Sequence, residues 1–256
     1  MPKQQPRILL YDLETTPILG YTWGFYEQNV LKIVESPYIL CFAYKWLDEK
    51  KTHVVSLTDF PGYKKNKKND RQLVKNLHEL MDEADITIAQ NGDRFDNKWA
   101  NKQFIKHNLP PVSPYKSIDT LKIARKHFRF DSNRLDDLGE FLGVGRKVKH
   151  QGIDLWMQVM SNDPKAWEDM KRYVRQDVVL LEKLYLKLRP FTNNHPNLNQ
   201  YTEDEYPRCP ICQSYNIIKK AYRPVGRFSR VRRYLCKDCG GWSQGKTQRI
   251  PELEIS

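Results

Sequence analysis

Residues 7–16 read Arg-Ile-Leu-Leu-Tyr-Asp-Leu-Glu-Thr-Thr, and this stretch decides the fold. The short apolar run from Ile8 to Tyr11 is typical of a buried central strand, and an acidic residue follows it directly. Asp12 and Glu14 are two residues apart, so in extended chain both side chains point to the same face and can hold one metal ion. We therefore expect a metal site at the end of a central strand. A solvated strand end is the alternative.

The following residues alternate between strand-like and helix-like patterns. The charged stretch 48–51 separates two strand-like segments and predicts an antiparallel extension of the sheet. Pro164 is favoured at a first helical turn, and Gly143 is suited to close a helix. This order predicts an α/β fold with a mixed sheet covered by helices, although propensity alone does not fix the strand order. We expect strands over 38–44, 52–57, 85–90 and near Ile118, and helices over 70–83, 96–107, 121–126, 135–142 and 164–188.

Three further residues are candidates for the same site. Asp96 follows the strand 85–90 on a turn into a helix, at the sheet edge where Asp12 emerges, and its alternative role is an N-cap. Tyr173 and Asp177 are four residues apart on the long helix and share one face. The alternative for Asp177 is a surface carboxylate that pairs with a neighbouring arginine, Arg172 or Arg175.

Four acids on separate elements suit a reaction that needs two divalent cations about 4 Å apart, which clamp the attacking and leaving oxygens of a phosphodiester. Hard cations such as Mg²⁺ take oxygen ligands and keep several waters. No protein nucleophile is then needed, since water attacks and a tyrosine hydroxyl beside the site can orient it. The pattern therefore favours a metal-dependent nuclease.

Three motifs resemble those of the DEDD superfamily of 3′→5′ exonucleases: Asp12-Leu-Glu14-Thr-Thr, Asn91-x-x-x-Phe95-Asp96 and Tyr173-x-x-x-Asp177. Arg172 stands where the histidine subclass has its histidine, so the resemblance is to the tyrosine subclass. The segments 117–120 and 133–138 resemble the proofreading domains of family B DNA polymerases and related stand-alone exonucleases, several of them encoded by bacteriophages. The resemblance covers residues 7–188.

The resemblance implies an RNase H-like fold, two Mg²⁺ or Mn²⁺ ions and release of nucleotides from a 3′ end. It implies that Asp12, Glu14 and Asp177 bind the first metal and that Asp12 bridges to the second. Asp96 would act largely through metal-bound water, and Tyr173 would position the nucleophile.

Motif positions near the substrate are also implied. Asn91 and Phe95 are candidates to contact the terminal nucleotide, although Phe95 is equally suited to fill the core. Asp119 is a fifth acid, which we interpret as a helix cap. A lysine cluster at 64, 65, 67 and 68 predicts a solvated loop, with a phosphate-contacting loop as the alternative.

Four of the five cysteines form two Cys-x-x-Cys pairs, Cys209 with Cys212 and Cys236 with Cys239, separated by 23 residues. Four thiolates at such spacing predict a closed tetrahedral site for one structural Zn²⁺, as in a zinc ribbon. Free thiols in a disordered basic tail are the alternative. Cys41 stands alone in an apolar run and is expected to be a buried structural thiol.

The net charge of +12 is concentrated near the C-terminus. Residues 208–249 hold eleven lysines and arginines against a single acid, Asp238, and so carry +10 of it. Aromatic residues are interleaved with this charge, which favours binding of nucleic acid with little sequence preference, although some of the aromatics are expected to form the small core. The candidate contacts are Arg223, Arg227, Arg230, Arg232 and Arg233.

These patterns predict an exonuclease domain over 1–189, a linker over 190–207 and a basic zinc-ribbon module over 208–256. We expect a two-metal 3′→5′ exonuclease that acts most readily on single-stranded DNA ends, with a DNA polymerase or other replication protein as a possible partner. A structure-specific nuclease and a non-catalytic binding subunit are the alternatives. No run approaches the roughly 18 apolar residues of a membrane helix, so we expect no membrane partner and a cytoplasmic protein, in the host cytoplasm if phage-encoded.

Overall fold

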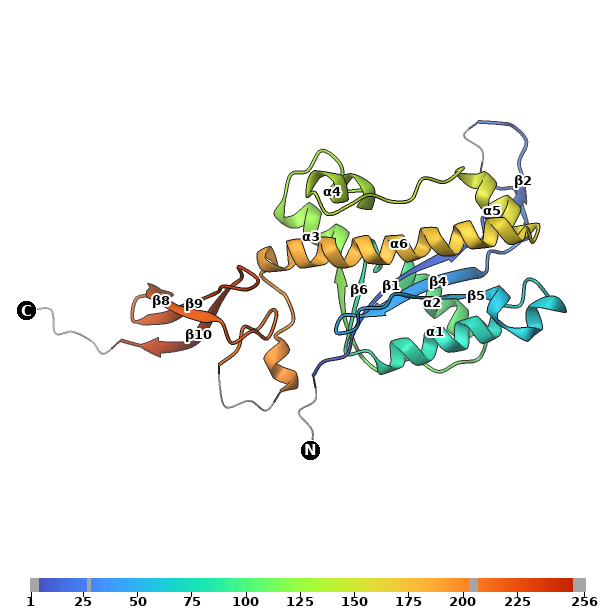
Figure 1. Ribbon diagram of the computed structural model, residues 1–256. Coiled ribbons are helices and arrows are strands. Elements are labelled where there is room, and N and C mark those ends of the chain that lie inside the picture. Colours follow the sequence, from blue (N-terminus) through green and yellow to red (C-terminus); the bar gives the residue numbers. More distant parts are fainter. Residues whose placement is uncertain (1–4, 27–28, 203–206, 251–256) are drawn as a thin grey trace, which may run out of the picture. The chain divides into compact units, whose positions relative to one another are not determined.

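The structure, a computed structural model, describes residues 5–26, 29–202 and 207–250. The chain divides into two compact units, one of which is Arg7–Leu184. This unit is built on a five-stranded mixed sheet with the order β5-β4-β1-β6-β7 (Figure 1). The central β1 pairs antiparallel with β4 and parallel with β6. The strands are β1 Ile8–Thr15, β4 Ile39–Trp46, β5 His53–Ser56, β6 Ile86–Ala89 and β7 Lys116–Asp119.

Helices cover the sheet, and Figure 1 shows it between α6 and α1. The central strands are nearly continuous apolar runs because both of their faces are buried. α1 turns Leu73, Leu77 and Met81 inward at helical spacing, which explains why this stretch forms an amphipathic helix. The helices are α1 Arg71–Glu83, α2 Asp96–Lys106, α3 Thr120–His127, α4 Leu135–Phe141, α5 Ile153–Met160 and α6 Pro164–Leu188.

The predicted α/β class with a mixed sheet is confirmed, including the antiparallel β4–β5 extension. The predicted helix 164–188 coincides with α6, and Gly143 lies at a positive φ of 64° directly after the C-cap of α4. Two elements were not predicted: α5, which has eight residues, and a hairpin of β2 Leu19–Tyr21 with β3 Lys32–Glu35. Both are too short for their periodicity to stand out.

The second unit contains the cysteine pairs and an antiparallel three-stranded sheet with the order β10-β9-β8. The strands are β8 Ile217–Pro224, β9 Ser229–Cys236 and β10 Trp242–Arg249. Two short 3₁₀ helices, η3 Arg189–Phe191 and η4 Leu198–Tyr201, lie in the segment predicted as a linker. There Leu198 is buried, and its backbone N–H donates to the carbonyl of Pro210 at 2.8 Å. None of the described helices is long and apolar enough to cross a membrane.

Candidate functional site

Three acids from two elements converge at the end of β1. Asp12 and Glu14 flank Leu13, which is buried in the core, so the alternation of the strand turns both carboxylates to the opposite face. Asp177 reaches the same place from α6 and is 2% exposed. One carboxylate oxygen of each of these three residues lies within 4.8 Å of the others. The alternative role for Asp177, a surface carboxylate that pairs with Arg172 or Arg175, is wrong because the side chain is buried and its ion pair is with Lys147.

Asp96 is attached to β1 between the first two acids. It is the first residue of α2 and 1% exposed, and its Oδ1 accepts a hydrogen bond of 3.1 Å from the backbone N–H of Leu13. The side chain therefore ties the start of α2 to β1, and the N-cap position belongs to Phe95. Asp96 is outside the group of three converging oxygens, but its charge helps to raise the pKa of Asp12.

Burial and mutual repulsion make it costly for the acids of this site to ionise. Burial, with the charges of Asp96, Glu14 and Asp177, raises the pKa of Asp12 well above its ordinary value. Burial and the charge of Asp177 raise the pKa of Glu14 to about 8, and burial raises the pKa of Asp96 to about 7. Carboxylates that are this costly to ionise call for a compensating positive charge.

The donor set fits a divalent cation. Oxygens around an octahedral Mg²⁺ at about 2.1 Å lie about 3.0 Å apart when adjacent and about 4.2 Å apart when opposite, so the three carboxylates, whose oxygens lie within 4.8 Å of one another, can share one ion once their side chains draw closer together. The Oδ1 atom of Asp177 is buried and has no hydrogen-bond partner among the described residues. A buried carboxylate oxygen without a partner is costly, and a metal ligand role removes that cost. The acid group can therefore bind a metal.

A lysine that was not predicted stands beside the acids. The ammonium of Lys147 donates to Oδ2 of Asp177 at 2.5 Å and to the hydroxyl of Tyr173 at 3.0 Å. Burial lowers the pKa of Lys147, but the charges of Asp177, Tyr173 and Asp12 and the hydrogen bond to Asp177 together outweigh it and leave the pKa raised, so the lysine is charged. Burial and the charges of Glu14 and Asp177 raise the pKa of Tyr173, so the phenol is neutral. Lys147 lies outside any helix or strand, so no periodic pattern in the sequence marked it. The one indication was the general rule that a buried acid needs a nearby cation.

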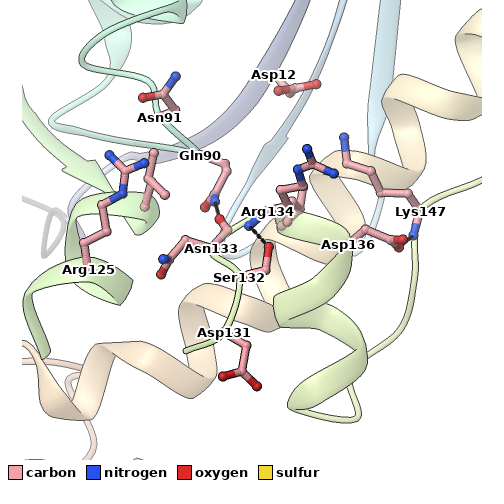
Figure 2. A pocket seen from close by; sticks show the side chains of 12 residues that line it. Asp12, Gln90, Asn91, Arg125, Asp131, Ser132, Asn133, Arg134, Asp136 and Lys147 are labelled. Atoms are coloured by element: carbon pink, nitrogen blue, oxygen red, sulfur yellow. Dashed lines mark hydrogen bonds between the residues drawn. The ribbon is translucent and has the colours of Figure 1, made fainter. Parts of the chain in front are cut away.

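A pocket of about 540 Å³ opens beside Asp12 (Figure 2). Figure 2 shows Arg125 on one wall, with Arg134 and Lys147 extending toward Asp12 from the other. Ten of its twelve lining residues are polar or charged, among them Gln90, whose side chain donates to the carbonyl of Asn133 at 2.9 Å. Such a pocket, with a few convergent polar groups, is in the size range of small-molecule sites.

The motif positions next to the pocket are held by a capping acid. Asn91 lines the pocket and has a positive φ of 63°, and its backbone N–H donates to Asp119 at 2.9 Å. Asp119 also accepts from the N–H of Leu121, which confirms its predicted cap role on α3. Phe95 is 38% exposed, so it does not fill the core. Whether Asn91 and Phe95 contact a nucleotide stays a prediction.

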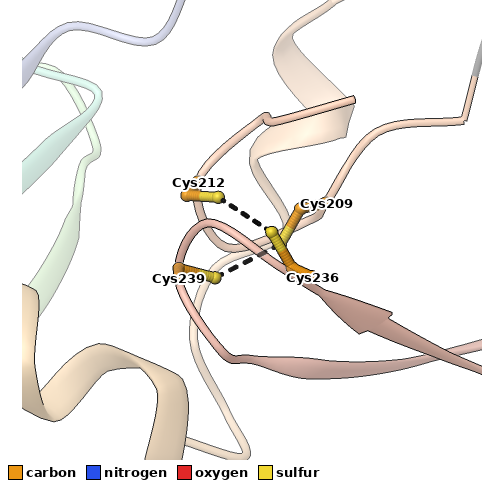
Figure 3. A group of neighbouring side chains, drawn as sticks. All are labelled: Cys209, Cys212, Cys236 and Cys239. Carbon is orange, nitrogen blue, oxygen red and sulfur yellow. Dashed lines mark hydrogen bonds between the residues drawn. The ribbon is translucent and has the colours of Figure 1, made fainter. Parts of the chain in front are cut away.

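The four cysteines of the second unit converge on one point (Figure 3). The sulfurs of Cys209 and Cys239 lie 3.7 Å apart and those of Cys212 and Cys236 lie 3.6 Å apart. Four thiolates at about 2.3 Å from a tetrahedral ion are separated by about 3.8 Å, which matches these two distances, and all four sulfurs lie within 4.8 Å of one another, so the cluster can hold one metal ion. Gly241 allows this closure, because a Cβ there would meet Ile211 at 2.7 Å.

The candidate arginines of the second unit lie on β8 and β9 and on the turn between them. Arg223, Arg227 and Arg230 are exposed, and Arg232 and Arg233 are half-buried. The guanidinium of Arg232 stacks 3.7 Å from the ring centroid of Tyr222. The two cysteine pairs, residues 209–212 and 236–239, form a knuckle. Its buried residues are Cys209, Cys236 and Ile211, so the small core of this module is not built from its aromatic side chains.

The fold and the acid site define a protein of the RNase H-like class. The sequence profile of the RNase_H superfamily matches residues 10–189, and the chain belongs to this superfamily, whose members are typically nucleases. A solved structure with a similar fold is the family B DNA polymerase from the hyperthermophilic archaeon Pyrobaculum calidifontis, with a TM-score of 0.56 and 16% identity. The similarity covers 77% of this chain but only 27% of the polymerase. No curated protein matches the sequence.

Proposed function

We propose that this chain is a metal-dependent 3′→5′ exonuclease of the tyrosine subclass of the DEDD superfamily, acting on single-stranded DNA. The observation that carries the proposal is the convergence of three carboxylates within 4.8 Å, one of which, Asp177, is buried and has an orphaned oxygen. Membership of the RNase_H superfamily supports nuclease chemistry. The direction of cleavage and the tyrosine subclass rest on the resemblance of the motifs.

Asp12, Glu14 and Asp177 would hold a first Mg²⁺ or Mn²⁺, and Asp12 and Asp96 would help to hold a second. When bound, the cations would supply positive charge for the phosphodiester oxygens and activate water. Without cations, the raised pKa values of Glu14 and Asp96 keep protons on the acids near neutral pH. The hydrogen bond from the backbone N–H of Leu13 to Asp96 holds Asp96 beside Asp12 and Glu14. It would therefore fix the positions at which the cations bind.

Tyr173 and Lys147 would organise the reacting groups. The phenol of Tyr173 accepts a hydrogen bond from Lys147, and its O–H lies within hydrogen-bond reach of Asp177, from which it would turn to orient a water molecule or a phosphate oxygen. Two of the three N–H donors of Lys147 are used on Asp177 and Tyr173, which leaves one for the substrate. Lys147 also offsets the charge of Asp177, which a polyanionic substrate would otherwise meet directly.

The pocket beside Asp12 would hold the terminal nucleotide. Arg125 and Arg134 line it and would attract phosphate oxygens, whereas Asn91 and Gln90 offer amide groups to a base or sugar. Phe95, with its partly exposed ring, would stack on the terminal base. A snug pocket for a single nucleotide would favour removal of one nucleotide at a time over internal cleavage.

The second unit would capture the nucleic acid. Its four cysteines would hold a structural Zn²⁺, and its arginines, stacked on aromatic rings, would neutralise phosphates with little sequence preference. The first unit is close to neutral in charge, so a basic module would help to bring a polyanion to its acids. Association with a DNA polymerase is a further part of the proposal, supported only by the resemblance to proofreading domains.

The test is an assay on 5′-labelled single-stranded DNA with Mg²⁺, Mn²⁺ or EDTA. We expect a ladder of products that shorten by one nucleotide from the 3′ end, and a loss of at least about 10³-fold in Asp12→Ala because the cations lose a shared ligand. Arg172→Ala is the matched control, because this residue lies on the same helix but outside the site. Cleavage of a circular single strand, or activity that survives both EDTA and Asp12→Ala, would overturn the proposal.

A further inference from the structure

The hairpin of β2 and β3 exposes apolar side chains on an element that has no core of its own. It follows β1 after only three residues, and Figure 1 shows β2 at the edge of the first unit. Trp23 is 88% exposed and Phe25 is 99% exposed, and Tyr21 is also exposed. Exposed apolar patches on a protein surface often mark a binding site, so we expect these aromatic rings to bind a ligand or partner.

The hairpin has a defined geometry despite its exposure. β2 pairs antiparallel with β3, and a Cβ at Gly20 would meet the backbone oxygen of Lys32 at 2.8 Å, so the glycine permits close approach of the two strands. The backbone N–H of Leu31 donates to the carbonyl of Tyr21 at 2.8 Å. The aromatic side chains are thus presented from a paired strand and the turn that follows it.

A lysine loop adjoins this hairpin. Lys68 forms an ion pair with Glu35 at the end of β3 and links the loop after η2 Pro61–Lys64 to the hairpin. Lys64, Lys65 and Lys67 in the same loop are exposed. The hairpin itself carries Lys32 against Glu27 and Glu35 in the sequence, so the positive charge of this surface comes from the four lysines of the adjoining loop.

This combination favours a single-stranded nucleic acid over an apolar protein partner. Exposed aromatic rings stack on unpaired bases of any sequence, and neighbouring lysines neutralise the phosphates between them. Eight residues lie between Glu14 and Trp23, so Trp23 lies at most about 32 Å from Glu14, measured between their Cα atoms. At about 3.4 Å per stacked nucleotide, a bound strand would reach it within about nine nucleotides of its 3′ end.

We infer that Tyr21, Trp23 and Phe25, together with Lys64, Lys65 and Lys67, form an accessory site for the 5′ portion of a single DNA strand whose 3′ end occupies the acid site. The inference rests on the proposed exonuclease function and adds a substrate-binding surface to it. Bases between the fourth and ninth positions from the 3′ end stack on the rings, and the lysine loop contacts their phosphates.

The test measures binding by the full, zinc-loaded chain in buffer without Mg²⁺ or Mn²⁺, where no cleavage is expected. Fluorescence anisotropy compares a labelled twelve-nucleotide strand with the same strand lacking bases at positions four to nine from its 3′ end. The wild type is expected to prefer the intact strand by at least about tenfold, and Trp23→Ala/Phe25→Ala to lose most of that preference, because each stacked base contributes measurably. Trp23→Phe/Phe25→Tyr keeps the rings and should keep the preference, as should Ile105→Ala, whose side chain is 77% exposed elsewhere on the unit.

The lysine loop is tested by salt dependence. Lys64→Ala/Lys65→Ala should reduce the slope of log affinity against log salt by about 1.4, since each contact to a single strand contributes about 0.7. Lys50→Ala/Lys51→Ala is the matched control, because it removes two exposed lysines on the turn between β4 and β5. An unchanged base preference in the alanine variant, or equal slopes in the two lysine variants, would overturn the inference.

Hydrolysis of the p-nitrophenyl ester of thymidine 5′-monophosphate separates this inference from the proposed function. The ester has one nucleotide and cannot reach the hairpin, so the hairpin variants should hydrolyse it at the wild-type rate. A wild type that does not hydrolyse the ester or cleave DNA contradicts the exonuclease, while the binding comparison still decides the hairpin.

Discussion

The described residues contain two clusters of side chains that could hold a metal ion, and their structural surroundings are opposite. The acids Asp12, Glu14 and Asp177 stand at the edge of a large core formed by a five-stranded sheet and its helices. The four cysteines stand where there is almost no other core, because the buried neighbours of the knuckle reduce to Ile211 and partly buried Ile217. The acid cluster therefore destabilises a unit whose large core keeps it folded. A metal bound by the cysteine cluster would instead supply much of the free energy that folds the second unit.

The difference has an energetic reason. Burial and mutual repulsion disfavour the ionised forms of the acids in the first unit, as the raised pKa values of Asp12 and Glu14 indicate. Removing a metal from such a site leaves a folded protein with strained charges. Removing a metal from a four-cysteine knuckle removes the free energy of folding itself, which is about 10 kcal/mol or more for structural zinc sites. Three perturbations sharpen this contrast.

The largest effect is expected from Cys236→Ser. Loss of one thiolate should reduce bound zinc from one ion per chain to nearly none and unfold the knuckle, because little apolar area remains to hold it. Zinc analysis and limited proteolysis of residues 208–250 measure the outcome, while the melting of the first unit should not change. Cys41→Ala is the control, since Cys41 is a buried core thiol away from the cluster and should leave zinc content intact. A protease-resistant knuckle in Cys236→Ser would break the comparison.

A smaller effect is expected from Lys147→Met, which leaves Asp177 buried without its cation. Breaking a buried ion pair in this way costs about 3 kcal/mol, so urea unfolding in EDTA should shift to lower denaturant, and activity should fall as well. Lys122→Met is a matched control, because its pair with Asp93 has the same 2.5 Å separation but is largely exposed, and should change stability by less than about 1 kcal/mol. Lys147→Met/Asp177→Asn should recover most of the lost stability. Equal costs for the two single variants would contradict the role of burial.

This lysine also marks the limit of what the sequence predicts. The long periodic segments were predicted within one or two residues, and α6 in full, because their apolar faces pack on a large core. The positions of Asp12 and Glu14 followed from strand alternation. Lys147 was missed because a tertiary bond positions it: its backbone N–H donates to Asp136 at 2.7 Å, and no local pattern shows this. The bond from Leu13 to Asp96 is of the same kind.

The smallest effect is expected from Glu14→Gln, and it has the opposite sign. The pKa of Glu14 is raised from 4.5 to about 8 by burial and the charge of Asp177, so the folded chain binds more protons than the unfolded chain between these values. Stability in EDTA should then fall as pH rises from about 4.5 to 8, and the glutamine variant should escape that fall. We expect the variant to melt about 3–6 °C higher than the wild type at pH 8 and no higher near pH 4.5.

The same substitution should reverse its sign when metal is present, which separates a metal ligand from an acid that is merely buried. Saturating Mn²⁺ stabilises only a chain that binds it, so the wild type should gain several degrees at pH 8 and the glutamine variant little. Glu140→Gln is the control, since that carboxylate is exposed and should respond neither to pH nor to Mn²⁺ in this way. A wild type that melts higher than Glu14→Gln in EDTA at pH 8 would contradict the charge repulsion on which the contrast between the two clusters depends.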